Sequence, residues 1–224
     1  MANIADDITE LVGNTPLLRL HKFEKEAGFE GKILAKLEVF NPTGSVKDRI
    51  AKNMIEQAER DGRLKPGGTI IEATSGNTGI GLAAIAAAKG YQAVIVMPDS
   101  MSKERIRILE AYGAKVVLTP GEKNMGGANE KAAEILEQTE NAIITGQGGN
   151  PSNPEAHYQT TGPEIWKDTG ENVDIFVATV GTGGTISGTG KFLKEKNPDV
   201  RVVAVEPFTS AVLSHEPSGK HGIQ

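Results

Sequence analysis

Short apolar segments alternate with helix-like segments along most of the sequence, and this alternation constrains the fold more than any other feature. The apolar segments are rich in β-branched residues and apolar on both faces, which is typical of buried parallel strands. We predict strands at residues 33–39, 69–73, 93–97, 115–118, 142–144, 174–180 and 202–205. We predict helices at residues 45–61, 79–89, 102–112, 127–139, 154–168 and 185–196. This order predicts an α/β fold of two doubly wound domains with mostly parallel sheets.

Two stretches rich in glycine, proline and asparagine are candidates for connections between domains. They are residues 41–44 and residues 146–154. If the chain crosses between domains at both places, residues 42–149 form a smaller inserted domain, and residues 1–41 with residues 150–224 form a larger one. We therefore expect a cleft between two domains, lined by loops that follow the strands.

Composition argues against several classes of protein. The 224 residues are 38% hydrophobic and 24% charged, which is ordinary for a globular protein. The formal net charge of −5 argues against nucleic-acid and anionic-membrane partners. The absence of cysteine excludes disulfides and thiolate metal sites, and it fits a cytoplasmic location. We expect no signal peptide and no membrane span. We predict no metal site, because the histidines lack metal-ligand spacing; they are His21, His157, His215 and His221.

Lys47 is the candidate catalytic residue. It follows a predicted strand and lies in the first turn of a predicted helix, with Ser45 as N-cap and Asp48 completing a capping-box-like start. Burial and the partial positive charge of a helix N-terminus both lower the pKa of an amine below its free value of about 10.4. A neutral amine can form a Schiff base and afterwards act as a base. The alternative is an ordinary solvated lysine.

Residues 74–79 form the second candidate, a loop between a predicted strand and a predicted helix. Its side-chain hydrogen-bond donors are Thr74, Ser75, Asn77 and Thr78. Gly76 lets main-chain amides approach a ligand, and the helix that follows adds its N-terminal dipole. A carboxylate is the natural ligand of such a loop. The alternative is a set of side chains that only cap the helix.

Residues 181–185, with the sequence Gly-Thr-Gly-Gly-Thr, form the third candidate. Consecutive amides without bulky side chains at a helix start can wrap a phosphate. The lysine of a nucleotide P-loop is missing, which favours a small monophosphate over ATP with magnesium. A tight strand-to-helix turn without a ligand is the alternative.

Residues 79–84 match the dinucleotide pattern G-x-G-x-x-A, and Asp99 lies near the expected acidic position. The glycines of that motif should form the turn directly after the strand, but residues 74–78 already occupy the turn here. We interpret Gly79 and Gly81 as glycines that allow close helix packing. A nicotinamide-dependent enzyme is kept as an alternative.

Six segments together resemble the cysteine synthases, also called O-acetylserine sulfhydrylases. These are fold-type II pyridoxal-phosphate (PLP) enzymes, whose fold is like that of tryptophan synthase β. The segments are residues 11–17, 41–49, 74–79, 150–154, 161–166 and 181–185. The resemblance covers essentially the whole chain. It implies that residues 1–41 with 150–224 bind the PLP phosphate, and that residues 42–149 carry the loop for the substrate carboxylate.

The resemblance implies a role for each candidate residue. Lys47 carries PLP and then removes the Cα proton of the substrate, and Asn77 hydrogen-bonds the ring hydroxyl of the cofactor. The substrate carboxylate is bound by Thr74, Ser75, Gly76, Thr78 and Gln147. The phosphate is bound by Gly181, Thr182, Gly183, Gly184 and Thr185. The implied enzyme is a cytoplasmic, homodimeric transferase of cysteine biosynthesis. It converts O-acetylserine and sulfide into cysteine and acetate through an aminoacrylate intermediate.

Two departures from the family pattern leave alternatives open. Gly148 stands where the family usually has phenylalanine, so we expect a looser pocket, and cystathionine synthesis from an activated serine and homocysteine is one alternative. The chain ends at Gln224, where the family continues with a portion that includes the residue contacting the pyridine nitrogen. We therefore expect a C-terminally truncated member with an incomplete large domain. A non-catalytic module that binds the C-terminal peptide of serine acetyltransferase is the other alternative.

Overall fold

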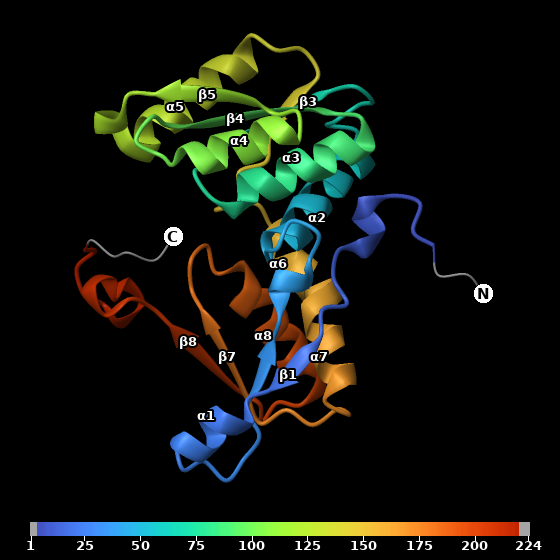
Figure 1. Cartoon of the computed structure of the whole chain (residues 1–224), viewed down its shortest axis with the longest axis vertical. Coiled ribbons are helices and arrows are strands. Elements are labelled where there is room, and N and C mark those ends of the chain that lie inside the picture. Colours follow the sequence, from blue (N-terminus) through green and yellow to red (C-terminus); the bar gives the residue numbers. More distant parts are fainter. Residues whose placement is uncertain (1–3, 220–224) are drawn as a thin grey trace. The chain divides into compact units, whose positions relative to one another are not determined.

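The structure is a computed structural model that describes residues 4–219. It divides between Gly146 and Gln147 into two compact units, which are described separately here (Figure 1). This boundary falls inside the glycine-rich stretch that the sequence indicates as a connection. The predicted grouping of residues 1–41 with residues 150–224 concerns how the units associate, and it stays a prediction.

The first unit contains a four-stranded parallel sheet in the order β5-β4-β3-β6. The strands are β3 (Thr69–Ala73), β4 (Gln92–Pro98), β5 (Lys115–Thr119) and β6 (Ala142–Ile144). The chain steps from β3 to β4 to β5 in one direction and then returns to place β6 on the other side of β3. The strand order therefore reverses between β3 and β6. In open α/β sheets ligands bind beyond the carboxyl ends of the strands at such a point.

Helices cover both faces of this sheet. They are α2 (Lys47–Arg60), α3 (Asn77–Lys89), α4 (Lys103–Ala111) and α5 (Asn124–Glu137). Figure 1 shows α3 and α4 on one face and α5 on the other, and α2 packs on α3. Alternate side chains divide between the faces, as they must in a strand. Val94 and Val96 join Ile71 in the core under α5, whereas Ile95 lies against α3 at Gly79.

An antiparallel hairpin precedes this sheet in the chain. Its strands are β1 (Leu17–Arg19) and β2 (Leu34–Lys36), with α1 (His21–Glu26) between them. The prediction of a strand over residues 33–39 was too long, because the chain turns into η2 (Glu38–Phe40) after β2. A short 3-10 helix, η1 (Ile8–Leu11), lies before the hairpin.

The second unit contains one parallel pair, β7 (Ile175–Thr179) and β8 (Arg201–Val205), joined by α8 (Gly184–Lys196). The predicted helix over residues 154–168 is present as three joined pieces. They are α6 (Ser152–Ala156), the π-helical η4 (His157–Thr161) and α7 (Gly162–Asp168). Two 3-10 turns follow β8, namely η5 (Phe208–Ser210) and η6 (Val212–Ser214).

The core of the second unit is small. Ile165 of α7, Leu193 of α8 and Val200 before β8 are buried together, with Phe176 and Trp166 packed against them. The other face of the β7–β8 pair keeps apolar side chains exposed, namely Ile175, Val177, Val203 and Val205.

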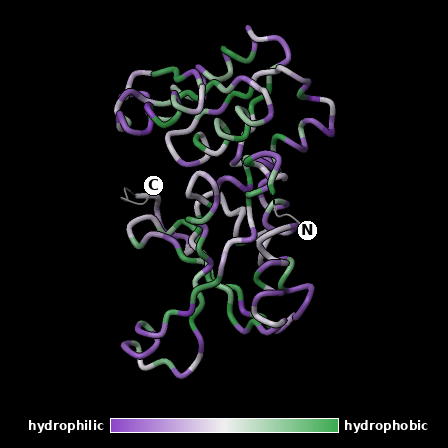
Figure 2. The backbone as a smooth tube through the Cα atoms, turned by 45° about the vertical axis from the view of Figure 1, so that its right-hand side comes forward, coloured by the Kyte–Doolittle hydropathy of each residue, from purple (hydrophilic) through white to green (hydrophobic). Residues whose placement is uncertain are grey.

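In Figure 2, hydrophobic stretches of the backbone tube alternate with hydrophilic ones. Among the helices of residues 4–219, none is both long and apolar enough to cross a membrane. The predicted α/β class with mostly parallel sheets is confirmed.

Candidate active site

Lys47 lies in the first turn of α2, as the sequence predicts, and it is the first residue of this helix. The hydroxyl oxygen of Ser45 accepts a hydrogen bond from the main-chain N–H of Lys47 at 3.2 Å. The predicted capping box is wrong. The N-cap is Val46, and the carboxylate of Asp48 instead accepts hydrogen bonds from the N–H of Thr43 at 2.7 Å and from the Thr43 hydroxyl. The loop before the helix folds back over its first turn, so it offers Asp48 these donors in place of the N-cap amide.

The side chain of Lys47 is half-buried, and burial lowers its pKa below the ordinary value for lysine. Within residues 4–219 its Nζ amine has no ion-pair or hydrogen-bond partner. A larger share of this amine is therefore neutral at physiological pH than for a surface lysine. The predicted direction of the pKa shift is confirmed, and the physical cause is loss of hydration.

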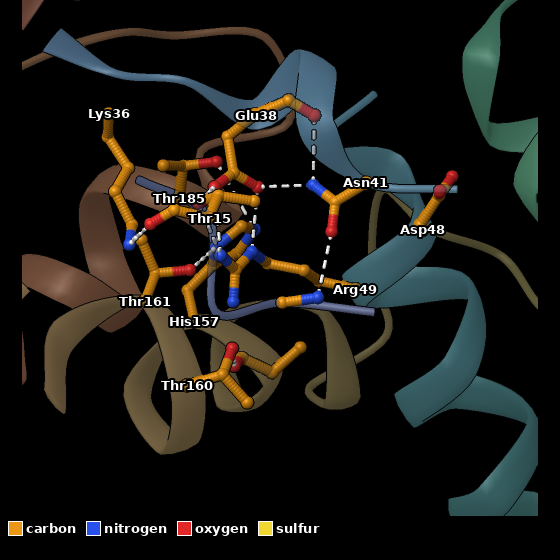
Figure 3. Close-up of polar contacts among 12 residues, drawn as sticks. Thr15, Lys36, Glu38, Asn41, Asp48, Arg49, His157, Thr160, Thr161 and Thr185 are labelled. Atoms are coloured by element: carbon orange, nitrogen blue, oxygen red, sulfur yellow. Dashed lines mark hydrogen bonds and ion pairs between the residues drawn. The ribbon is translucent and has the colours of Figure 1, made fainter. Parts of the chain in front are cut away.

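The two residues after Lys47 anchor its turn through buried polar contacts. The carboxylate of Asp48 accepts a hydrogen bond from the N–H of Thr43. Arg49 donates from Nε to Oε2 and from Nη2 to Oε1 of Glu38, at 2.7 and 2.8 Å (Figure 3). Burial raises the pKa of Glu38, but the hydrogen bonds and charge of Arg49, with hydrogen bonds from Thr15 and Asn41, hold it below its usual value. The pair thus fixes the start of α2 to the segments before it.

Glycine at position 81 brings the first turns of α2 and α3 together. A Cβ at Gly81 would lie 3.2 Å from the carbonyl oxygen of Lys47 and 3.2 Å from the Cβ of Ala51. Gly79 faces the sheet instead, since a Cβ there would lie 3.2 Å from Cγ2 of Ile95. Both glycines lie within α3, which supports the interpretation as packing glycines and disfavours the dinucleotide motif.

The predicted carboxylate loop lies at the carboxyl end of β3. Thr74, Ser75 and Gly76 form the turn, and α3 begins at Asn77, two residues before the predicted start at Gly79. The N-cap of this helix is Gly76, which makes no side-chain cap hydrogen bond, and the hydroxyl of Thr74 accepts a long 3.3 Å hydrogen bond from the N–H of Gly76. Asn77 is exposed, Thr74 and Thr78 are buried, and Ser75 and Gly76 are half-buried. The dipole of this helix start favours an external anion.

The turn after β6 is tied to the neighbouring strand β3. The carboxylate of Glu72, 4% exposed, accepts hydrogen bonds from the Thr145 hydroxyl at 2.5 Å and the Gly146 N–H at 2.7 Å. The loops after β3 and β6 thus flank the point where the strand order reverses. Sequence reasoning missed Glu72, because a buried glutamate inside an apolar strand gives no sign of its partner 74 residues away.

The predicted phosphate loop occupies the turn between β7 and α8. Gly183 is the N-cap of α8 with φ +82°, a left-handed conformation that glycine adopts at no steric cost. Gly181 and Thr182 are exposed. Within the described residues, the main-chain N–H groups of residues 181–185 donate no hydrogen bond. These amides and the helix dipole are available to a phosphate.

Asn153 supports this loop and was not singled out from the sequence. Its Nδ2 donates to the carbonyl oxygen of Gln147 at 2.8 Å and to the Thr182 hydroxyl at 3.0 Å. A Cβ at Gly184 would lie only 1.8 Å from Oδ1 of Asn153, so a larger residue there has no room. The asparagine in the stretch 150–154 was the available signal, but sequence reasoning treated that stretch as a connection.

His157 is a buried, hydrogen-bonded histidine. Its Nδ1 lies 2.9 Å from the hydroxyl of Thr161, and its Nε2 lies 3.2 Å from the hydroxyl of Thr185 (Figure 3). In the part of the chain that the structure describes, no cluster of acidic and histidine side chains could hold a metal ion. Gly148, by contrast, faces open space, because a Cβ there would have no atom within 4 Å.

Comparison with known proteins identifies the family. Residues 8–222 match the model for pyridoxal-phosphate dependent enzymes, and the chain belongs to this family. It is 54% identical over 224 residues to a probable cysteine synthase of Bacillus subtilis, and 51% identical over 220 residues to a cysteine synthase of Staphylococcus aureus. A crystal structure of cysteine synthase from Entamoeba histolytica matches with a TM-score of 0.95 and 47% identity.

These matches cover nearly all of this chain but only part of each relative. The chain spans 71% of the Bacillus protein, 70% of the Staphylococcus protein and 66% of the Entamoeba chain. The same three matches extend over 99%, 98% and 99% of this chain, respectively.

The residues present fit the cofactor of this family. PLP needs an amine for its aldehyde and donors for its phosphate. Taken by itself, the first unit holds a half-buried lysine amine, and the second unit, taken by itself, holds a helix start. Among the described residues, neither this amine nor the amides of residues 181–185 have a partner. A side chain at Gly184 would displace Asn153, so glycine there preserves the loop.

Proposed function

We propose that this chain carries the machinery of a PLP-dependent cysteine synthase, which converts O-acetylserine and sulfide into cysteine and acetate. The C–O bond at the substrate Cβ breaks, and a C–S bond forms at the same carbon. The main support is the half-buried amine of Lys47, which has no counter-ion among the described residues and follows a loop that fixes its helix turn. The names of the relatives support the same reaction.

Lys47 is assigned two roles, attachment of the cofactor and proton transfer. When bound, PLP supplies an electron sink for the electron pair left at the substrate Cα. The Nζ atom of Lys47 accepts the Cα proton. Its lowered pKa supports this role, because a neutral amine is the competent base. The anchored neighbours Asp48 and Arg49 hold the main chain from which this amine projects.

The loop residues are assigned to binding. Ser75 and Gly76 form the turn before α3, and they offer donors to the substrate carboxylate beside that helix start. The same role is proposed for Thr74, Thr78 and Gln147. Asn77 is proposed to hydrogen-bond the ring hydroxyl of PLP. The amides and hydroxyls of residues 181–185 are proposed to hold its phosphate, which the unpaired amides and the N-terminus of α8 favour.

An absorption experiment tests the proposal. The PLP-loaded protein should change its visible spectrum when O-acetylserine is added, and it should release cysteine once sulfide follows. Lys47→Ala should reduce turnover by a factor of about 10² to 10⁴, the usual contribution of a general base. Lys103→Ala, at an exposed position of α4, is the matched control and should stay near wild type.

Two results would contradict the proposal. One is full turnover by Lys47→Ala. The other is a clear preference for homocysteine over sulfide when both acceptors compete, which would favour cystathionine synthesis and give the open space at Gly148 a role.

Assembly and location are further proposals. We infer a homodimer in the cytoplasm and binding of the C-terminal peptide of serine acetyltransferase. The sequence resemblance supports the dimer and the peptide, and the cysteine-free sequence fits a reducing compartment. Light scattering of the purified protein, a peptide titration and cell fractionation test the three statements separately.

A further inference from the structure

Arg105 connects helix α4 to the predicted carboxylate loop. It lies in the first turn of α4, and its Nη1 donates a hydrogen bond of 2.5 Å to the main-chain carbonyl oxygen of Ser75, 30 residues earlier in the chain. Arg105 is half-buried, and both residues belong to the first unit. The assigned roles of Lys47 and of the loop side chains leave this arginine unused.

The packing around Gly79 fixes the face of α4 that carries Arg105. A Cβ at Gly79 would lie 3.0 Å from Cγ2 of Thr74 and 3.7 Å from Cδ2 of Leu109. The end of β3, the first turn of α3 and helix α4 therefore meet at this glycine. Leu109 is buried and follows Arg105 by four residues, so both side chains lie on one face of α4. The packing of Leu109 therefore directs the side of α4 that carries Arg105 toward the loop after β3.

The contact sets the orientation of one peptide group. The described residues contain no cis peptide bond, so the carbonyl of Ser75 and the N–H of Gly76 point in opposite directions. Arg105 binds the carbonyl, and the N–H is directed away from the guanidinium, where it makes a long 3.3 Å contact with the hydroxyl of Thr74. If this peptide flipped, a carbonyl oxygen would stand where the amide is, and it would repel an anion.

We propose that Arg105 is a positioning residue for the substrate carboxylate, acting through the peptide group between Ser75 and Gly76. It keeps a donor on the side of the loop that receives the carboxylate, and it adds positive charge behind the loop. Because Arg105 contacts the main chain of the loop, it acts through that loop. This inference rests on the proposed function. It assigns to Arg105 an effect on how tightly the same site binds the substrate carboxylate.

The experiment compares Arg105→Met with Arg107→Met in the PLP-loaded protein. Arg107 lies on the same helix and is exposed, so its replacement by methionine removes the same charge without breaking the contact with Ser75. Arg105→Met should raise the KM for O-acetylserine and the dissociation constant of acetate, measured by calorimetry, by about tenfold each, the scale of one charge-assisted hydrogen bond. The KM for sulfide and the amount of PLP bound per protein chain should each change less than twofold. Arg105→Lys should recover part of the loss, since it retains the charge.

Three outcomes would overturn the inference. One is an unchanged KM for O-acetylserine and unchanged acetate affinity in Arg105→Met. The second is an equal change in Arg107→Met, which would indicate a long-range charge effect. The third is a parallel loss of PLP and of both substrates, which would indicate general damage. If the wild type makes no cysteine, the proposed function fails, while the acetate measurement still decides the role of Arg105.

Discussion

The two units differ in how completely they cover their sheets. In the first unit helices lie on both faces, and Ile71 and Val96 are 0% exposed. In the second unit the β7–β8 pair is covered by α8 on one face, while Ile175 and Val177 on the other are 48% and 57% exposed. The first unit can therefore hold Lys47 through its own core. The proposed phosphate loop of the second unit depends on local contacts from Asn153 and His157.

The largest predicted effect is a difference in stability between variants of the two sheets. Ile71→Ala should lower the free energy of unfolding of the first unit by about 3 kcal/mol, because it leaves a cavity in a closed core. Val177→Ala should change the stability of the second unit by less than about 0.5 kcal/mol, because its side chain is mostly exposed. Hydrogen exchange resolves each unit, and the single tryptophan, Trp166, reports the second by fluorescence. Equal losses in both variants would refute the contrast.

The next effect concerns the ion pair beside Lys47. Glu38→Gln removes the negative charge that contacts the buried Arg49, and removing one partner of a buried pair commonly costs 3–5 kcal/mol. Glu38 is 18% exposed and glutamine keeps hydrogen bonds, so we expect about 2 kcal/mol at pH 7, measured by hydrogen exchange of the first unit. Glu56→Gln, at the looser 3.9 Å pair with Arg60, is the control and should cost under about 0.5 kcal/mol.

The same pair gives a pH dependence with a definite sign. The pKa of Glu38 is lowered in the folded protein, so its stabilisation is complete above the unfolded value near 4.5 and is lost as the pH falls through the folded value. Glu38→Gln should remove this part of the acid sensitivity. An unchanged acid profile in the variant would show that other carboxylates dominate.

A third predicted effect concerns the loop of residues 181–185 in the second unit. Gly184→Ala places a Cβ where Asn153 lies, so we expect about tenfold weaker PLP binding, equivalent to about 1.4 kcal/mol. Gly181→Ala adds a Cβ with no atom within 4 Å and should change the affinity less than threefold, a difference of about 0.6 kcal/mol. Cofactor absorbance after dialysis measures both. Equal affinities would indicate that Asn153 does not shape the loop.

The smallest effect is a gain in stability. Burial disfavours the charged form of Lys47, so Lys47→Met should stabilise the cofactor-free protein at pH 7 by less than about 1 kcal/mol, a low figure because the side chain is only half-buried. The gain should shrink as the pH rises toward 10.5, where the unfolded lysine also loses its proton. Urea unfolding at pH 7 and pH 10 measures it. A loss of stability at pH 7 would contradict the assignment.

The sequence predicted the central strands β3 and β4 well because they are buried on both faces. Residues 69–73 and 142–144 match β3 and β6 in full, and α2 and α8 begin within two residues of the prediction. The hairpin β1–β2 was not predicted as a pair. Its strands are only three residues long, and their half-exposed side chains give no clear period.

Contacts between distant segments were beyond sequence reasoning. The three loops were found because glycine and small polar residues follow apolar runs. The contacts of Glu72 with Gly146, of Asn153 with Thr182 and of Arg105 with Ser75 were missed, since each depends on strand order or helix packing. Asp48 shows the same limit locally, because its partner Thr43 is set by the path of the loop.

The most direct test of the central claim is to reduce the PLP-loaded protein with borohydride and to map the labelled peptide. Reduction fixes the cofactor to the amine that holds it. The account predicts label on Lys47, at the start of α2, and no label in Lys47→Ala. Bound PLP with its label on any other lysine would contradict the account.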